Sequence, residues 1–294
     1  KKINIKKACL IWHKNCSIIV CTFNCNGSCG LSRIFLRGDI LKIAVCYKCV
    51  PFNESISVKG DRTLDLDKVT WEIGKYDPNA AEAACQIAAV SGDEAVAVSA
   101  NGSVLADSKL RKSILSRGLT QLFAVQDDSL SLADSLTTAK ALKAVIEKIG
   151  DVQLAICGEG SGDVYAQQVG NTLGALLGWN TVNAVKKLEY VDGKLVCERN
   201  VSDGTETVEV TMPAVISVTA DANVPRVPTM KDILGAGKKP AQVWSLEEVG
   251  LAAGQAYETV SILAPEQTER KKIMIEGASD EAIDTLVGYI KNAL

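Results

Sequence analysis

The chain has 294 residues, a formal net charge of −3, 47% hydrophobic residues and 23% charged residues, a composition typical of a soluble globular protein with one large α/β domain or two small ones. The lack of a basic excess argues against nucleic-acid binding, and the sequence contains no run of about 18 or more apolar residues that would predict a transmembrane helix. The sole histidine, His13, lies outside the regular part of the chain, which excludes Ser-His-Asp, Cys-His and histidine-ligated metal chemistry from the main domain. We therefore expect a cytoplasmic protein whose own side chains do little acid–base chemistry near neutral pH.

The first 40 residues differ from the rest of the chain. They contain five of the ten cysteines, seven lysines and arginines, one acidic residue and no sustained periodicity. Three interpretations are open: a metal or cluster site, a secretory signal around the apolar run 16–23, and translated upstream sequence. The cluster site would use the cysteines at intervals of four, Cys21, Cys25 and Cys29.

Translated upstream sequence has specific support. Arg37-Gly38-Asp39 can be encoded by AGG-GGA-GAT, a purine-rich sequence typical of a ribosome-binding site, and Leu41 by a TTG start codon. We therefore predict that residues 1–40 are non-native upstream translation and disordered, and that the natural protein begins at residue 41 with methionine.

From residue 41 onward, strand and helix patterns alternate. Asp77 is expected as the N-cap of the first helix, with Pro78 at its first position, and the polar segment 61–73 indicates a hairpin or a loop with short strands. The predicted strands are 42–46, 94–99, 121–125 and 152–157, and the predicted helices are 78–90, 107–117 and 135–149. This alternation predicts an α/β fold with a doubly wound, mostly parallel, Rossmann-like sheet, in which ligands bind beyond the carboxyl ends of the strands.

A glycine-rich loop, 158–163, follows the fourth strand and leads into a helix predicted at 165–177. Such a loop can bind a phosphate, because glycine lets the backbone approach closely and exposed N–H groups donate to anions. A flexible turn is the alternative, since the loop matches neither G-x-G-x-x-G nor a P-loop.

The last third of the chain is first β-rich and then extended. A hairpin is predicted to turn at Asp192-Gly193. We place the end of the compact domain at residue 240 and expect an extended arm beyond it, which either embraces a partner or folds back on its own domain. The predicted elements are a hairpin at 186–199, strands at 207–212 and 214–219, and a final helix at 280–294.

Five stretches of residues 41–294 carry a specific pattern: KIAVCYKCVP (42–51), YDPNAAEAACQ (76–86), KLRKSILSRG (109–118), GEGSGDVYAQQVG (158–170) and NVPRVPTMKDILGAGKKP (223–240). Residues 197–216 also follow V-x-R-x-x-D/E-D-G-x-E-x-L-x-x-x-x-P-A-V-V, with departures at Cys197, Ser202, Val208 and Ile216. In these motifs the chain resembles the electron-transfer flavoprotein beta-subunit family, in its Fix-type branch linked to carnitine and related acyl-CoA reduction.

The resemblance implies one subunit of a heterodimer and not a complete enzyme. The beta subunit pairs with a larger alpha subunit, FAD lies mainly in alpha with beta covering it, and beta's own site holds AMP in simple carriers or a second FAD in electron-bifurcating complexes. Electrons pass from a donor to an acyl-CoA dehydrogenase or reductase-type flavoprotein, and the flavin carries the chemistry, so no catalytic side chain is expected. Residues 41–240 would form the nucleotide-binding domain, and 241–294 an arm and helix packing on the alpha subunit.

The family's cofactor contacts fall at the end of the first strand, before the first helix, after the second strand and in the phosphate loop. In the phosphate loop Val164 and Tyr165 replace the family's Gly-Asp pair, which leaves the identity of the nucleotide open. The residues carried over are Ala44, Val45, Cys46, Gly74, Ser99, Ala100, Asp163, Gln167, Gln168, Val169 and Gly170.

Residues 222–234 match the family's recognition loop, which docks the redox partner. Leu234 is the expected apolar anchor, and Lys238 and Lys239 either steer an acidic partner or serve solubility. Separately, Cys46-x-x-Cys49 resembles half of a zinc or redox motif; without a second pair we expect a packing role and no metal site.

Two other function classes stay in play. A nucleotide-binding regulatory protein of the universal-stress type would share the α/β architecture, but its G-x-x-G-type phosphate motif is missing from the sequence. An enzyme acting alone is the other, and the missing histidine and nucleophile motif weigh against it.

Overall fold

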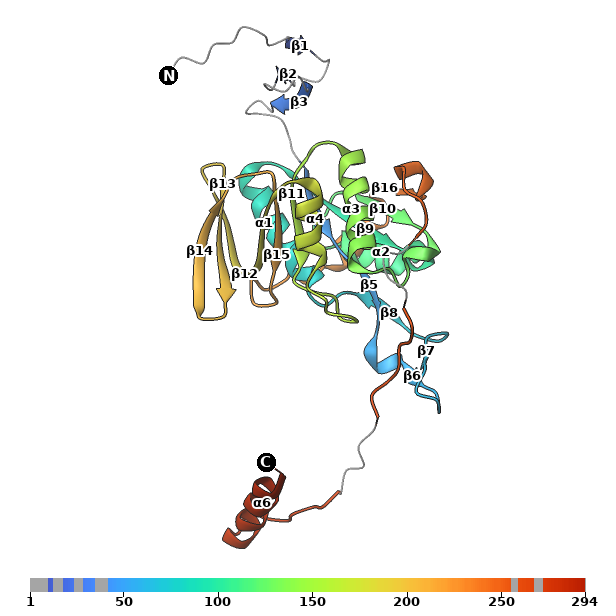
Figure 1. Cartoon of the computed structure of the whole chain (residues 1–294), viewed down its shortest axis with the longest axis vertical. Coiled ribbons are helices and arrows are strands. Elements are labelled where there is room, and N and C mark those ends of the chain that lie inside the picture. Colours follow the sequence, from blue (N-terminus) through green and yellow to red (C-terminus); the bar gives the residue numbers. More distant parts are fainter. Residues whose placement is uncertain are drawn as a thin grey trace. The chain divides into compact units, whose positions relative to one another are not determined.

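The computed structural model describes residues 10–12, 18–23, 29–34, 42–254, 259–266 and 272–293 (Figure 1). These residues fall into two compact units. One comprises the chain up to Ile56 together with Leu66–Thr259, and the other comprises Ser57–Asp65 together with the chain from Val260 onward. All cofactor residues predicted from the sequence belong to the first unit.

Three short strands lie within the first 40 residues: β1 (Leu10–Trp12), β2 (Ile18–Phe23) and β3 (Cys29–Ile34). They pair antiparallel in the order β1-β2-β3, which differs from the disorder predicted for residues 1–40. The rest of this segment, including Cys25 of the suggested cysteine cluster, lies outside the described residues. Its origin by upstream translation stays a prediction.

A nine-stranded sheet forms the centre of the first unit, in the order β14-β13-β12-β15-β11-β4-β9-β10-β16. The strands are β4 (Lys42–Cys46), β9 (Glu94–Asn101), β10 (Leu122–Gln126), β11 (Val152–Gly158), β12 (Asn180–Val191), β13 (Lys194–Val201), β14 (Gly204–Val210), β15 (Ala214–Val218) and β16 (Ala241–Trp244). Neighbours from β12 across to β16 run parallel, whereas β13 and β14 add antiparallel pairs beyond β12. The predicted mostly parallel α/β sheet with a β-rich addition is confirmed.

Helices cover both faces of the sheet, because its central strands are apolar on both sides (Figure 1). In β4, Ile43 and Val45 face one hydrophobic cluster, and Ala44 and Cys46 face the other. The first cluster is covered by α1 (Asp77–Ser91) and α2 (Ser108–Leu115), and the second by α3 (Ser135–Ile149) and α4 (Val169–Leu177), while α5 (Met230–Ala236) packs on α2.

The start of α1 differs from the prediction. The helix begins at Asp77 itself, with Tyr76 as N-cap and no side-chain cap, so the predicted N-cap role of Asp77 is wrong. Oδ2 of Asp77 instead accepts the backbone N–H of Lys48 at 2.8 Å. A contact between segments far apart in the sequence has replaced the local one that the sequence pattern suggested.

The start of α4 also differs. The helix predicted to begin at residue 165 begins at Val169. Tyr165 and Gln167 have φ angles of 51° and 55°, left-handed values that a regular α-helix does not contain, so the earlier start is wrong. The loop between β11 and α4 is therefore longer than expected.

The β-rich addition follows the predicted turn. Asp192 and Gly193 have φ angles of 49° and 83°, and two positive angles in a two-residue loop match the right-handed twist of the flanking strands. An ion pair between the two strands supports the hairpin on its exposed side, Lys187 with Glu198 at 3.7 Å. The predicted hairpin is confirmed, with longer strands.

The compact domain continues past the predicted boundary at residue 240. β16 pairs parallel with β10, and its Trp244 stacks on Phe123 with ring centroids 5.8 Å apart. Leu246, 6% exposed, packs in the same hydrophobic cluster, before the short 3₁₀ helix η4 (Glu247–Val249). The boundary was placed too early because a four-residue edge strand carries no periodic signal.

Short elements complete both units. The first unit adds β5 (Cys49–Pro51), β8 (Trp71–Ile73) and the 3₁₀ helices η1 (Asn53–Ser55), η2 (Ser103–Ala106) and η3 (Asp128–Leu130). The second unit contains β6 (Ser57–Val58), β7 (Leu64–Asp65) and α6 (Asp280–Ala293).

In the second unit Arg62 Nη1 pairs with Glu266 at 2.8 Å, and Thr63 forms an antiparallel bridge with Leu263. Helix α6, which confirms the predicted final helix, leaves Ile283, Leu286 and Ile290 each 50% exposed. Across the described part of the chain, no helix combines the length and the apolar character needed to cross a membrane.

Candidate nucleotide-binding site

The topological switch point of the sheet lies between β4 and β11, which are parallel neighbours. After β4 the chain passes through α1 on one face, whereas after β11 it passes through α4 on the other. The loops that follow these two strands therefore diverge, and ligands of doubly wound sheets bind at this point.

Three charged side chains from separate segments meet at the switch point. Oδ2 of Asp77, at the start of α1, accepts the N–H of Lys48, which follows β4. Nζ of Lys48 lies 2.6 Å from Oδ2 of Asp163, in the loop after β11. Asp77 is 7% exposed, whereas the side chains of Lys48 and Asp163 are 34% and 22% exposed. A buried carboxyl group thus lies behind an ion pair at the surface.

Burial raises the pKa of Asp77 to about 7, because the charged carboxylate is poorly solvated there; the N–H and the charge of Lys48 act in the opposite direction. Burial also acts to raise the pKa of Asp163, but hydrogen bonds from Lys48 and Ser161 outweigh it and leave this pKa below its usual range. Asp77 can therefore exchange a proton near neutral pH while Asp163 stays ionised.

The glycine-rich loop lies directly against the start of α1. A Cβ at Gly158 would lie 2.6 Å from Cβ of Tyr76, and a Cβ at Gly160 would lie 2.5 Å from the ring of Tyr165. The rings of Tyr76 and Tyr165 are 5.5 Å apart between centroids. Glycine therefore makes room in this loop for the Cβ of Tyr76 and for the Tyr165 ring, which supports a packed loop over the flexible turn considered as the alternative.

The N-terminus of α4 faces the same loop. Its N-cap, Gln168, makes no side-chain capping bond, so the first N–H groups of the helix keep their capacity to bind an anion. Gly170 permits close packing here, since a Cβ would lie 2.2 Å from Oγ of Ser217 in β15. The predicted phosphate-loop residues Gln167, Gln168, Val169 and Gly170 therefore lie at the start of α4.

The other predicted cofactor residues lie around this point but are mostly buried. The side chains in β4 (Ala44, Val45 and Cys46) are at most 5% exposed, and the backbone of this strand pairs with β9 and β11 on its two sides. Ser99, in β9, is fully buried and its Oγ donates to the carbonyl of Tyr47 at 2.8 Å.

Gly74 donates its N–H to the carbonyl of Lys48, and a Cβ there would lie 2.6 Å from Oδ2 of Asp77. Ala100, 9% exposed, follows Ser99. Their contacts with a cofactor stay predictions.

Cys46 and Cys49 are packed in the interior. Cys46 pairs in register with Cys157 of β11, and the pKa of Cys46 is raised first by its hydrogen bond with the Cys157 side chain and then by burial. Burial raises the pKa of Cys49 to about 12. Thiols with raised pKa values are poor nucleophiles and poor metal ligands, which supports the packing role.

Sequence reasoning missed Asp77, Lys48 and Tyr76 as members of the site. Asp77 was interpreted as a helix cap. Lys48 follows the first strand, and the rule that ligands bind beyond the carboxyl ends of parallel strands could have identified it. Tyr76 carries no comparable signal, because its position depends on how α1 docks against the loop after β11.

The segment 222–239, named the 222–239 loop below, exposes a run of large apolar side chains. Val224, Val227, Met230 and Leu234 are 89%, 88%, 71% and 69% exposed, and Ile233 is 40% exposed. Monomeric proteins rarely expose contiguous apolar groups of this kind unless they serve an interaction. Leu234 is thus accessible, as its predicted anchor role requires.

The two lysines that follow differ in their surroundings. Nζ of Lys239 donates to the carbonyls of Leu115 and Leu119 at 2.8 and 2.6 Å, so its ammonium caps the end of α2 and is not free to steer a partner. The expectation for Lys239 therefore changes to an internal role. Lys238 is exposed, and its steering role stays a prediction.

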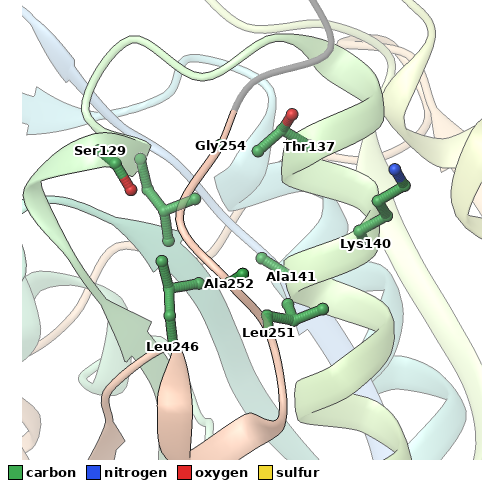
Figure 2. A pocket seen from close by; sticks show the side chains of 9 residues that line it. Ser129, Thr137, Lys140, Ala141, Leu246, Leu251, Ala252 and Gly254 are labelled. Atoms are coloured by element: carbon green, nitrogen blue, oxygen red, sulfur yellow. The ribbon is translucent and has the colours of Figure 1, made fainter.

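A separate cavity of about 290 Å³ lies between η3, α3 and the chain after β16 (Figure 2). Its hydroxyl groups are already engaged, since Ser129 Oγ donates to Asp127 and Thr137 Oγ1 donates to Asp134. None of the predicted site residues lines it. The cavity is therefore distinct from the switch-point site.

The sheet order and the helices on both faces define a doubly wound, Rossmann-like α/β domain, and its switch point is where such domains bind ligands. Residues 62–249, more than half of the chain, match the family model described as the electron transfer flavoprotein domain, and the chain belongs to this family.

Proposed function

We propose that this chain is the beta subunit of a heterodimeric electron-transfer flavoprotein of the Fix type. The observation that carries the proposal is the family match across the α/β domain. The beta-type sequence motif at 197–216 supports the choice of subunit, and its residues lie in β13, β14 and the start of β15. In this role the chain works in the cytoplasm and passes electrons to an acyl-CoA dehydrogenase or reductase-type flavoprotein.

We propose that an adenine nucleotide, AMP or part of a second FAD, binds at the switch point. The proposal rests on the uncapped start of α4 and on the Lys48 ammonium at the switch point. Backbone N–H groups of 167–170 would hold the phosphate. Flavin supplies the redox chemistry when bound, and this chain's residues bind, orient and shield the cofactors, so we propose no catalytic side chain.

We also propose that the C-terminal segment packs on the alpha subunit. Helix α6 carries apolar residues on its surface, including Val287 and Tyr289 at 39% and 45% exposed. None of its described side chains is buried. An amphipathic helix with an unburied apolar stripe gains its stability from a partner surface.

Co-expression of the chain with an electron-transfer flavoprotein alpha subunit tests the proposal. The purified complex is denatured, and released FAD and AMP are quantified against protein. One FAD and one AMP per heterodimer support a simple carrier, whereas two FAD without AMP indicate a bifurcating complex. A folded complex without flavin would contradict the proposed function.

Leu234→Ser should lower the rate of electron transfer to the acceptor flavoprotein by about tenfold or more, because an exposed apolar anchor contributes mainly to the complex. Folding stability should stay unchanged, since Leu234 is 69% exposed. Flavin absorbance in a stopped-flow instrument reports the transfer. Leu132→Ser is the matched control, with a leucine 58% exposed elsewhere on the domain; an equal loss in the control would refute the anchor role.

A further inference from the structure

A bidentate ion pair attaches the 222–239 loop to α1. Nε and Nη2 of Arg226 donate to the two carboxylate oxygens of Glu82 at 2.6 and 3.1 Å, and the backbone N–H of Arg226 donates to Oε2 at 3.2 Å. The side chain of Glu82 is 9% exposed. Bidentate pairs of this kind fix orientation as well as distance.

Side-chain amides make a second attachment one turn earlier in α1. Nδ2 of Asn79 donates to the carbonyls of Ala220 and Asn223 at 2.8 and 2.9 Å, and Nδ2 of Asn223 donates back to the carbonyl of Asn79 at 3.0 Å. The loop is thus joined to two successive turns of the same helix.

Gly118 provides room for the arginine. Its φ angle is 100°, and a Cβ there would lie 2.8 Å from Nη1 of Arg226. The neighbouring Arg117 donates from Nη1 to the carbonyl of Arg226 at 3.2 Å. The turn after α2 therefore contacts Arg226 as well as Glu82 does.

The far end of the loop is also attached to the domain, and α5 in its middle packs on α2. Lys239 is bonded to the carbonyls of Leu115 and Leu119. Between the two attachments, Thr229 and Asp232 form a capping box that starts α5, and this part exposes the apolar side chains.

We propose that Glu82 and Arg226 are positioning residues that hold the 222–239 loop in a preformed shape for docking the acceptor flavoprotein, an inference that rests on the proposed function. An exposed loop without fixed ends would lose conformational entropy on binding. Fixing its ends before the encounter removes much of that loss. The same helix starts at Asp77, so one element supports both the nucleotide site and the docking loop.

Hydrogen–deuterium exchange of the full chain measures the preformed shape without any partner. Glu82→Gln keeps the volume of the side chain but removes its charge and one acceptor, and amides in 222–239 should exchange about tenfold faster. Exchange in β11 and α3 should not change. Glu209→Gln, which breaks the exposed pair with Lys194, is the matched control and should leave the loop unaffected.

Two exchange results would overturn the proposal: an unchanged loop, or faster exchange throughout the domain, which would indicate a general structural role. If Glu82→Gln does not fold, Arg226→Gln makes the same comparison, because the arginine side chain is 43% exposed.

Kinetics of the flavin-loaded heterodimer provide the second readout. Glu82→Gln should raise the KM for the acceptor flavoprotein about five- to tenfold and leave kcat and the rate with a small dye acceptor unchanged. A looser loop with an unchanged KM would also overturn the proposal. Failure of the proposed function would be visible separately, as a wild-type complex that carries no flavin.

Discussion

Asp77→Asn should remove most of the loss of stability that the wild-type protein shows between pH 4 and 7, and should raise the free energy of unfolding at pH 8 by about 2–4 kcal/mol. The asparagine carbonyl can still accept the N–H of Lys48, which Oδ2 of Asp77 accepts in the wild type. The substitution therefore removes the titration while keeping the contact.

The direction follows from the pKa of the buried carboxyl group. Folding raises the pKa of Asp77 from 3.8 to about 7, because burial disfavours the anion. Between these values the folded protein binds a proton that the unfolded chain has released, so stability is fully present below about pH 4 and is lost as the pH rises to about 7. Above pH 7 the contribution is constant.

Urea unfolding followed by circular dichroism at pH 5, 6, 7 and 8 measures this effect. Asp192→Asn is the matched control, because Asp192 lies in the exposed hairpin turn at a positive φ that asparagine also tolerates. If Asp77→Asn and the wild type lost stability in parallel over this range, the assignment of the titrating group to Asp77 would be wrong.

Gly170→Ala should lower the free energy of unfolding by about 1–3 kcal/mol, although alanine normally favours a helix over glycine. The reason is the contact of α4 with β15: the new Cβ would lie 2.2 Å from Oγ of Ser217 but 3.6 Å from its Cβ. Adding Ser217→Ala removes the close atom and leaves an ordinary contact, so the double variant should recover most of the loss.

A double-mutant cycle measured by urea unfolding separates this contact from helix propensity. Gly235→Ala in α5 is the control, since a Cβ there would meet nothing within 4 Å. Absence of coupling between positions 170 and 217 would show that α4 can move away from β15 without loss. AMP titration of the single variant should also show weaker binding, because the same helix start forms the proposed phosphate site.

The two substitutions act on opposite sides of the switch point. Asp77 lies at the start of α1, after β4 and the short strands that follow it, and Gly170 lies at the start of α4, after β11. Asp77 contributes a protonatable group behind the Lys48–Asp163 pair, whereas Gly170 contributes space. Both contributions depend on where the fold places these two helix starts.

Most of the α/β order of this protein could be predicted from residue patterns alone. The apolar runs of β4, β9, β10 and β11 and the amphipathic pattern of α3 are repeated local signals, and each of these elements forms within one or two residues of its predicted bounds. The turn at Asp192-Gly193 was equally readable, because the residue types that tolerate positive φ are few. Strands and helices of this sheet bury particular faces, so their apolar residues recur at the spacing of the strand or the helix.

Contacts between distant segments could not be predicted in this way. Local pattern assigned Asp77 to a helix cap, started α4 at residue 165, ended the domain at residue 240 and left Lys239 in solvent. In the folded chain Asp77 bonds to Lys48, and Tyr165 and Gln167 have left-handed φ angles. β16 joins the sheet edge, and Lys239 caps α2. Each of these contacts depends on which segments the sheet order brings together. A hydrogen bond forms between groups that are close in space, and a local residue pattern carries no information on which distant segment that will be.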